Sequence, residues 1–204
     1  MRVVIVDAGG ANTGSVRYAF DRLGVDAALV TDAASIRAAE RVVLPGVGTA
    51  VQVMARLREL DLVDTLRTLQ VPLLGICVGM QLLFSRSEEG NIDALGLLPG
   101  RVVRLAGTPA LRVPHMGWNT MRKVRSSPLV EGIGPGDRAY FVHSYAAPVT
   151  ADCILACDHG APFAAVVQRG LVAGTQFHPE RSGRVGARLL RNFLSPDFAA
   201  GPTP

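Results

Sequence analysis

The sequence has few aromatic residues and almost no lysine, and these shortages exclude a dedicated nucleic-acid binder. Aromatic side chains make up 5% of the 204 residues, so the chain lacks the stacking surface that single-strand binders use. Of the 21 basic residues only Lys123 is a lysine, and the arginines are scattered rather than gathered in a dense run. The formal net charge of +4 is therefore that of a solvated surface, and we expect no nucleic-acid partner.

Cysteines and long hydrophobic runs are also scarce. The chain contains three cysteines, Cys77, Cys153 and Cys157. A secreted disulfide scaffold has a larger and even number, so a reducing cytoplasm suits this sequence best. The apolar stretch over 71–84 contains Gln81 and is shorter than the roughly 18 residues that a membrane span needs. The apolar span at the start of the chain is too short for a signal-peptide core. We expect a cytoplasmic protein without membrane attachment.

Short runs rich in Val and Ile, by contrast, are frequent, and in the first half they alternate with helical patterns. Hydrophobic residues make up 49% and charged residues 19% of the chain, which is the composition of a globular domain. Amphipathic helix patterns around 16–23 and 53–60 separate the apolar runs, and such strand–helix units form parallel sheets. The predicted strands are 3–6, 27–30, 42–44 and 73–76.

After about residue 100 the strands are shorter and little helix separates them, which indicates an antiparallel or mixed portion. A helix pattern covers 185–194, and strand patterns cover 102–105, 140–143, 154–156, 164–168 and 172–177. We expect an α/β fold whose mostly parallel central sheet is flanked by helices, with an antiparallel or mixed addition in the second half. Because no linker or repeat divides the chain, we expect one domain over 1–197 and a frayed tail over 198–204.

The segment 75–79, Gly-Ile-Cys-Val-Gly, places a cysteine between a buried strand and a helical run over 78–84. This is the G-x-nucleophile-x-G arrangement, which requires a strand-to-helix joint. Flanking glycines permit a crowded turn that exposes Cys77 above the carboxyl edge of the sheet, where open α/β sheets bind ligands. The helix that begins at Val78 favours thiolate over thiol through its dipole. Cys77 is therefore the predicted nucleophile.

An arbitrary cytosolic cysteine is more often a small buried hydrophobe, and that is our interpretation of Cys153 and Cys157. Their Cys-x-x-x-Cys spacing lies in a strand-like run and lacks the second pair of ligands that a zinc site needs. We expect both residues to be structural, and we expect neither a metal nor a cofactor.

A base and its orienting acid follow in Gln-Phe-His-Pro-Glu at 176–180. In extended backbone the i, i+2 spacing turns His178 and Glu180 to the same side, and Pro179 stiffens the segment. A carboxylate that fixes the imidazole tautomer completes a triad with Cys77. Alone, the segment would equally suit a capped strand end with a surface histidine. The acid follows the histidine at two residues, whereas in α/β-hydrolases it precedes the histidine, so an esterase is disfavoured.

With Gly-Ile-Cys-Val-Gly-Met-Gln at 75–81 and Gln-Phe-His-Pro-Glu at 176–180, the chain resembles the class I, triad-type glutamine amidotransferases. The resemblance implies their flavodoxin-like fold and their reaction. Cys77 would attack the side-chain amide of L-glutamine, and His178 would take the thiol proton and pass a proton to the departing ammonia. Hydrolysis of the resulting cysteinyl thioester would then release glutamate.

Three further segments resemble more narrowly the glutaminase subunits of imidazole glycerol phosphate synthase. They are Pro-Gly-Val-Gly at 45–48, Pro-His-Met-Gly-Trp-Asn at 114–119 and Tyr-Phe-Val-His-Ser-Tyr at 140–145. By that resemblance, backbone N–H groups of Val78 and of the 45–48 loop form the oxyanion hole. The residues expected around the glutamine and its oxyanion are Gly46, Val47, Gly48, Val78, Gln81, Ser144 and Tyr145.

The partner in those enzymes is a (β/α)8-barrel cyclase, which uses the ammonia to make imidazole glycerol phosphate and AICAR in histidine biosynthesis. The resemblance therefore implies a heterodimer. The positions that match barrel-facing residues of the family are Asn12, Trp118, Tyr140 and Arg181. A lone tryptophan is more often partly buried core, which is the alternative for Trp118.

Three other functions remain open from the sequence. The first is an amidotransferase for another acceptor, as in the anthranilate or guanylate pathways, against which the 114–119 segment argues. The second is a catalytically silent interaction subunit, which the intact Cys77, His178 and Glu180 disfavour. The third is a cysteine hydrolase of peptides or esters, which the order and spacing of the same three residues disfavour.

Overall fold

The computed structural model describes residues 1–9, 12–108 and 111–201. In the first half the strands are β1 (Val3–Val6), β2 (Ala27–Val30), β3 (Arg41–Gly46) and β4 (Leu73–Cys77). The helices between them are α1 (Thr13–Asp21), α2 (Ala33–Arg37), α3 (Ala50–Glu59) and α4 (Val63–Arg67). The four predicted strands and the two predicted helices of this half are confirmed. The short helices α2 and α4 were not predicted, because five residues carry too little periodicity to be recognised.

The second half alternates strands with short helices. Its helices are α5 (Val78–Gln81) and α6 (Gly183–Leu194), with the 3-10 turns η1 (Pro128–Val130), η2 (Pro179–Arg181) and η3 (Pro196–Ala200). Its strands are β5 (Phe84–Ser87), β6 (Ile92–Asp93), β7 (Leu98–Arg104), β8 (His115–Thr120), β9 (Arg122–Lys123), β10 (Arg138–His143), β11 (Tyr145–Ala146), β12 (Cys153–His159), β13 (Ala161–Arg169) and β14 (Val172–Thr175).

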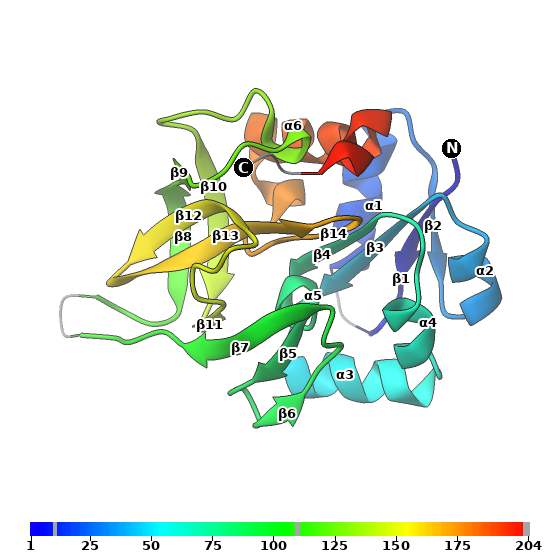
Figure 1. Cartoon of the computed structure of the whole chain (residues 1–204), viewed down its shortest axis with the longest axis horizontal. Helices are drawn as coiled ribbons and strands as arrows, with labels where there is room; N and C mark the ends of the chain where they lie inside the picture. Colours follow the sequence, from blue (N-terminus) through cyan, green and yellow to red (C-terminus); the bar gives the residue numbers. More distant parts are fainter. Residues whose placement is uncertain (10–11, 109–110, 202–204) are drawn as a thin grey trace.

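The centre of the molecule is an eight-stranded sheet in the order β2-β1-β3-β4-β14-β13-β12-β9 (Figure 1). The five strands from β2 to β14 pair in parallel, and the pairs from β14 to β9 are antiparallel. Two smaller sheets complete the fold, one of β8 with β10 and one in the order β11-β7-β5-β6. The predicted α/β class, a mostly parallel sheet with an antiparallel addition, is confirmed.

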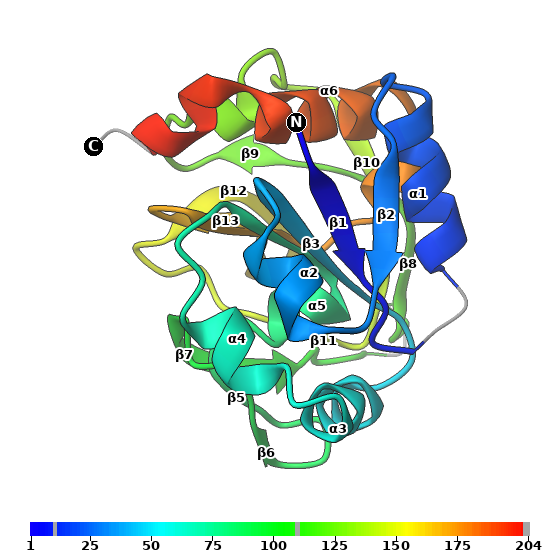
Figure 2. The same cartoon turned by 90° about the vertical axis from the view of Figure 1, so that its right-hand side faces the viewer.

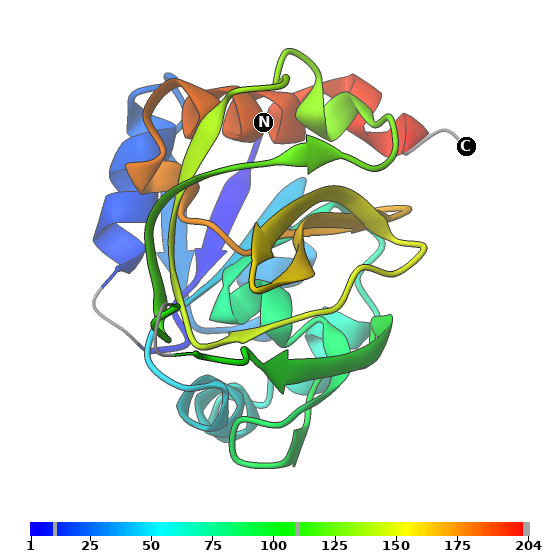
Figure 3. The same cartoon turned by 90° about the vertical axis from the view of Figure 1, so that its left-hand side faces the viewer.

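Helices cover both faces of the central sheet. Figures 1 and 2 show α1 and α6 together on one side, and α3 and α4 on the other, with the β5–β6 ribbon beside α3. Figure 3, from the opposite side to Figure 2, shows the β12–β13 ribbon between α6 and β7. No helix of the described residues is long and apolar enough to cross a membrane.

The predicted helix over 78–84 is longer than the helix in the structure, so this prediction is wrong in its end point. Helix α5 contains four residues, and Phe84 already begins β5, which pairs with β7 through Phe84 and Leu98. Leu82, Leu83 and Phe84 are all fully buried, so their apolar pattern suits a helix and a strand equally well. Pairing with a distant strand, which the local sequence does not reveal, decides the outcome.

The tail also differs from the expectation of fraying. Phe198 in η3 is fully buried, and its ring meets that of Phe193 edge to face with centroids 5.2 Å apart. Order therefore extends to Gly201, and residues 202–204 lie outside the described residues. The domain boundary at 197 stays a prediction.

Candidate active site

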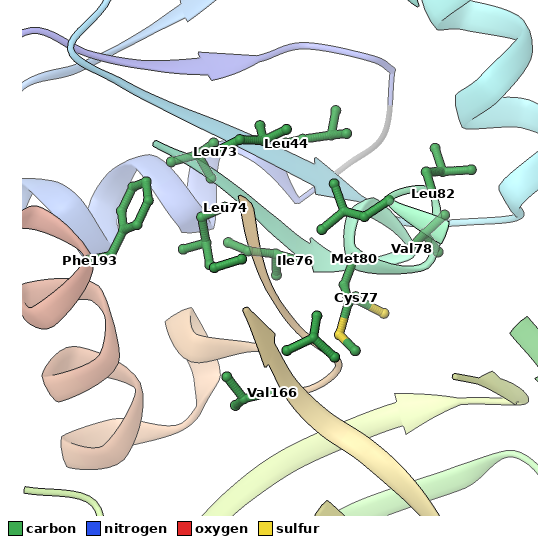
Figure 4. Close-up of a cluster of buried hydrophobic side chains, with 14 of the residues drawn as sticks. Leu44, Leu73, Leu74, Ile76, Cys77, Val78, Met80, Leu82, Val166 and Phe193 are labelled. Carbon is green, nitrogen blue, oxygen red and sulfur yellow. The ribbon is translucent and has the colours of Figure 1, made fainter. Parts of the chain in front are cut away.

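The predicted nucleophile lies at the carboxyl end of β4, in the middle of the sheet. Figure 4 shows Cys77 beyond Ile76, where the chain turns into α5. Its backbone has φ 54° and ψ −110°, a conformation that a residue with a side chain adopts only under constraint. Cys77 is 5% exposed and lines a cavity of about 430 Å³. That volume is in the range of small-molecule sites.

The glycines around Cys77 provide space for close packing of α5 against the sheet. A Cβ on Gly79 would lie 1.8 Å from the carbonyl oxygen of Leu44 in β3. A Cβ on Gly75 would lie 2.7 Å from the backbone of Gly79, and one on Gly46 would lie 2.7 Å from the Gly79 nitrogen. We expected the flanking glycines to provide the unusual backbone conformation of the turn. Instead, Cys77 itself has the strained backbone dihedral angles, and the glycines provide space.

The pairing of β14 with β4 brings the 176–180 segment to the nucleophile. The two strands are parallel neighbours, and Thr175 pairs with Ile76. Because parallel strands end at the same edge of a sheet, the residues after Thr175 lie beside Cys77. This strand was expected in the antiparallel or mixed portion of the chain. Its parallel placement next to β4 assembles the site.

His178 and Glu180 meet as predicted, but through a different backbone. Nδ1 of His178 lies 2.8 Å from Oε1 of Glu180, and Glu180 belongs to the 3-10 turn η2 rather than to extended chain. The carboxylate fixes the tautomer with the proton on Nδ1, so Nε2 is the nitrogen available to Cys77. Asn12 donates to the same carboxylate oxygen at 2.5 Å.

The buried side chains of His178 and Glu180 shift each other's pKa values toward their charged forms. Burial alone would lower the pKa of His178, but hydrogen bonds with Cys77 and Glu180 and their negative charges outweigh burial and raise the pKa to about 10. Burial alone would raise the pKa of Glu180, but the hydrogen bond and charge of His178, with a smaller contribution from Asn12, hold that pKa below its usual range. A charged imidazole is thereby kept beside the Glu180 carboxylate.

The cavity gathers most of the predicted substrate and oxyanion residues. Its walls contain Val47, Gly48, Cys77, Val78, Gln81, Ser144, Tyr145 and His178, together with Asn12 and Arg181 from the predicted partner face. Gly46 packs behind this wall against Val78, and Glu180 lies behind His178. Three further residues line the cavity without any signal in the sequence pattern: Glu89, Val142 and His143. Glu89 follows the short strand β5, whose presence beside the site has no local signal.

Comparison with known proteins agrees with this geometry. Residues 4–196 match the glutamine amidotransferase class-I family. The chain belongs to that family. It is 61% identical over 196 residues to the imidazole glycerol phosphate synthase subunit HisH of Xanthomonas axonopodis pv. citri, across 96% of this chain and 98% of that protein. It is 59% identical to the HisH subunit of Xylella fastidiosa (strain Temecula1), across 97% and 98%.

Solved structures share the fold. A glutamine amidotransferase crystal structure superposes with a TM-score of 0.74 at 22% identity, covering 94% of this chain and 97% of that one. PurLQS from Thermotoga maritima gives a TM-score of 0.65 at 19% identity, covering 95% and 97%. The predicted class I amidotransferase fold is therefore confirmed, and the identities near 60% confirm the narrower resemblance to the HisH subunits.

In this class I amidotransferase three of the four predicted partner residues, Trp118, Tyr140 and Arg181, form a partly exposed stack beside the cavity. Trp118 on β8 is 52% exposed, and its ring meets that of Tyr140 on β10 edge to face at 5.9 Å. The guanidinium of Arg181 lies 4.9 Å from the centroid of the Tyr140 ring. Arg181 also lines the cavity, so the stack reaches the cavity wall. The alternative for Trp118, a partly buried core residue, does not fit a side chain more than half exposed.

A neutral histidine pair, His115 and His143, lies at the cavity, which His143 lines. Nδ1 of His115 lies 3.0 Å from Nε2 of His143, whose own Nδ1 donates to the Tyr145 carbonyl at 2.9 Å. Burial lowers the pKa of His143 to about 3 and that of His115 to about 4. These rings stay neutral at physiological pH, so His178 is the ring that carries charge.

The remaining cysteines have the environment of structural residues. Cys153 and Cys157 are buried in β12, and burial raises the pKa of each thiol to about 12. Both side chains therefore remain thiols at physiological pH and are poor nucleophiles. Neither lines the cavity that contains Cys77.

Proposed function

We propose that this chain hydrolyses L-glutamine to glutamate and ammonia and supplies the ammonia to the (β/α)8-barrel cyclase of imidazole glycerol phosphate synthase in histidine biosynthesis. The observation that carries the proposal is the register of β14 on β4, which sets His178 beside Cys77 at one cavity. Membership of the class I family and the close HisH relatives support the same function.

The reaction follows from the order of the charged groups. The sulfur of Cys77 attacks the carboxamide carbon of glutamine, and the tetrahedral intermediate collapses as His178 gives a proton to the leaving ammonia. His178 then takes a proton from a water molecule that attacks the glutamyl thioester, and glutamate leaves with the thiolate restored. Glu180 stabilises the imidazolium whenever it is present, because its carboxylate accepts the hydrogen bond from Nδ1–H of His178 at 2.8 Å.

The oxyanion of the tetrahedral intermediate is assigned to backbone N–H groups of Val78 and of the 45–48 loop. Val47 and Gly48 border both the active-site cavity and a second cavity of about 630 Å³. The loop therefore has free space on both sides. Gly48 has φ 87°, a left-handed conformation that suits glycine, so this loop has the freedom to turn an N–H toward the substrate.

Recognition of free glutamine requires a partner for its α-ammonium group. Glu89 is the one carboxylate among the described residues that line the cavity, and it has a free oxygen besides the one that accepts from the Ala50 nitrogen at 2.6 Å. We assign the ammonium group to Glu89, and the backbone of Ser144 and Tyr145 to the rest of the amino acid. A cationic amino group beside a carboxylate distinguishes free glutamine from glutamine within a peptide.

The cyclase is assigned to the face that carries Trp118, Tyr140 and Arg181. Figure 2 shows β8 and β10, which hold the first two residues, side by side along one edge of the molecule. Exposed tryptophan, tyrosine and arginine are the side chains most enriched in interface hot spots. A cytoplasmic location is part of the proposal, since a cysteine nucleophile must stay reduced and the three cysteines are free thiols.

The test is glutamate release from glutamine by the purified chain, measured alone and with the cognate cyclase and its ribonucleotide ligand. We expect release that disappears in Cys77→Ala and that rises when cyclase and ligand are both present. Failure to detect cysteine-dependent release under any of these conditions would contradict the glutaminase function. Release that the cyclase does not stimulate would contradict the choice of partner.

A further inference from the structure

We propose that Gln176 is a further catalytic residue, whose side-chain amide donates a hydrogen bond to the sulfur of Cys77. The proposal rests on the proposed function, because it concerns the same nucleophile. Nε2 of Gln176 lies 3.7 Å from Sγ of Cys77, which is hydrogen-bonding distance for a sulfur acceptor. The Gln176 side chain is fully buried, so water does not compete for this contact.

The position of Gln176 follows from the sheet. Thr175 pairs with Ile76 in the parallel β14–β4 ladder, so Gln176 is the residue level with Cys77 on the neighbouring strand. The main-chain nitrogen of Gln176 donates to the Ala165 carbonyl at 2.9 Å, which holds its backbone against β13. The side chain therefore starts from a fixed point one strand away from the sulfur.

The orientation of the Gln176 amide is dictated by a neighbouring backbone carbonyl. Nε2 of Gln81 donates to the Tyr145 carbonyl at 2.8 Å, and a carbonyl oxygen only accepts. The same NH2 group of Gln81 donates to Oε1 of Gln176 at 3.0 Å. If the Gln176 amide were turned around, its NH2 would face that of Gln81, donor against donor. The amide is thus locked with its own NH2 toward Cys77.

The amide acts differently on the two forms of the nucleophile. A thiol carries its own proton, for which the Val142 carbonyl 4.0 Å from the sulfur is one acceptor, and it gains little from a further donor. A thiolate is a pure acceptor and gains both the Gln176 N–H and the charged His178. Hydrogen bonds to charged groups are about twice as strong as neutral ones. Gln176 therefore favours the reactive anion and holds the sulfur in one position.

The ordinary alternative is that Gln176 is a buried amide with a structural role only. The chain contains a matched example in Gln168 of β13, which is also fully buried. Its amide bonds to Ser127 and to the carbonyls of Gly170 and Phe198, and it lines none of the active-site cavity. Gln168→Met removes a buried structural amide, whereas Gln176→Met removes the donor to the sulfur. Methionine keeps the length and lacks the donor.

The experiment measures the rate at which iodoacetamide alkylates Cys77 in the folded chain as a function of pH, read by peptide mass spectrometry. We expect Gln176→Met to move the midpoint of this profile to higher pH and to slow alkylation at pH 7 by about tenfold. Gln168→Met should leave the profile in place, even if it lowers the melting temperature as much. A Gln176→Met profile that superposes on that of the unaltered chain would overturn the proposal.

A second variant covers the case in which Gln176→Met does not fold. Gln176→Glu keeps an oxygen for the Gln81 amide and has nearly the same shape, but it directs an acceptor at the sulfur. We expect its alkylation profile to move to still higher pH, and an unchanged profile would again overturn the proposal. The alkylation rate is measured without glutamine, so this experiment does not depend on glutaminase activity. If the profile shifts but the chain releases no glutamate from glutamine, the role of Gln176 is supported and the glutaminase function is contradicted.

Discussion

At the scale of single residues, His178 and Glu180 form a buried pair of opposite charges. The His178 side chain is 5% exposed and that of Glu180 is fully buried, so solvent screens their interaction weakly. Asn12 donates a second hydrogen bond to Oε1 of Glu180 at 2.5 Å. This contact was not predicted, since Asn12 was assigned to the partner face on resemblance alone. The contact gives Asn12 a structural role at Glu180.

The charged pair makes stability depend on pH. The pKa of His178 rises from 6.5 to about 10 on folding, so its stabilising contribution is complete below pH 6.5 and is lost as the pH rises toward 10. The pKa of Glu180 falls on folding, so its contribution is present above its ordinary value of 4.5 and is lost at lower pH. The pair therefore stabilises most between about pH 4.5 and 6.5.

We predict that His178→Gln loses more unfolding free energy at pH 6 than at pH 10, with a difference on the order of 2 kcal/mol. Urea unfolding of both proteins across this range measures it. A loss that is the same at every pH, or that grows toward pH 10, would show that the imidazole is not held in its charged form.

Glu89 is predicted to govern the affinity for glutamine rather than the chemistry. Glu89→Gln keeps an oxygen for the Ala50 nitrogen but loses the charge, so we expect KM for glutamine to rise about tenfold while kcat changes little. The neighbouring Glu88 is the matched control, because it bonds to Arg101 and Arg104 and does not line the cavity. Steady-state kinetics that respond equally to Glu88→Gln and Glu89→Gln would refute the assignment.

At the scale of elements, the strand-to-helix joint depends on the absence of side chains. Gly79→Ala would drive a methyl group into the Leu44 carbonyl, since the ideal Cβ lies 1.8 Å from that oxygen. We predict a loss of about 3 kcal/mol or more of unfolding free energy, because the rigid sheet cannot move away. Thermal unfolding measures the loss.

Gly14 provides the control for that substitution. It lies in α1, and a Cβ built on it meets nothing within 4 Å. Gly14→Ala should be neutral or stabilise the chain by up to about 1 kcal/mol, as alanine does in helices. If Gly79→Ala unfolded at the same temperature as Gly14→Ala, the close packing of α5 on β3 would be wrong.

The sequence predicted those elements whose pattern is local. The parallel strands and the helices α1, α3 and α6 have clear periodicity, and each is present. The sequence did not predict five strands, which are short or lack an apolar pattern: β5, β6, β8, β9 and β11. These strands form by pairing with other strands, which the local sequence does not reveal. The contact of His178 with Glu180 was predictable from residue types and spacing. The positions of Gln176 beside the sulfur and of Glu89 at the cavity were not, because they depend on strand register and on the β5–β6 turn.

At the scale of the whole molecule, the active site and the proposed docking face are continuous. Arg181 belongs to both, since it lines the cavity and stacks on Tyr140, whose ring meets that of Trp118. Ammonia formed at Cys77 is therefore released close to the face on which the cyclase would dock. Such an arrangement suits an enzyme whose product must pass to a second active site before it reaches water.

The glutaminase function is tested most directly by imidazole glycerol phosphate formation by the complex of this chain with its cognate cyclase, with either glutamine or ammonium chloride as nitrogen source. We predict that the unaltered complex uses both sources and that the complex with Cys77→Ala uses ammonium chloride only. A Cys77→Ala complex that forms product from glutamine, or an unaltered complex that cannot, would contradict the role of Cys77 as the source of ammonia for the cyclase.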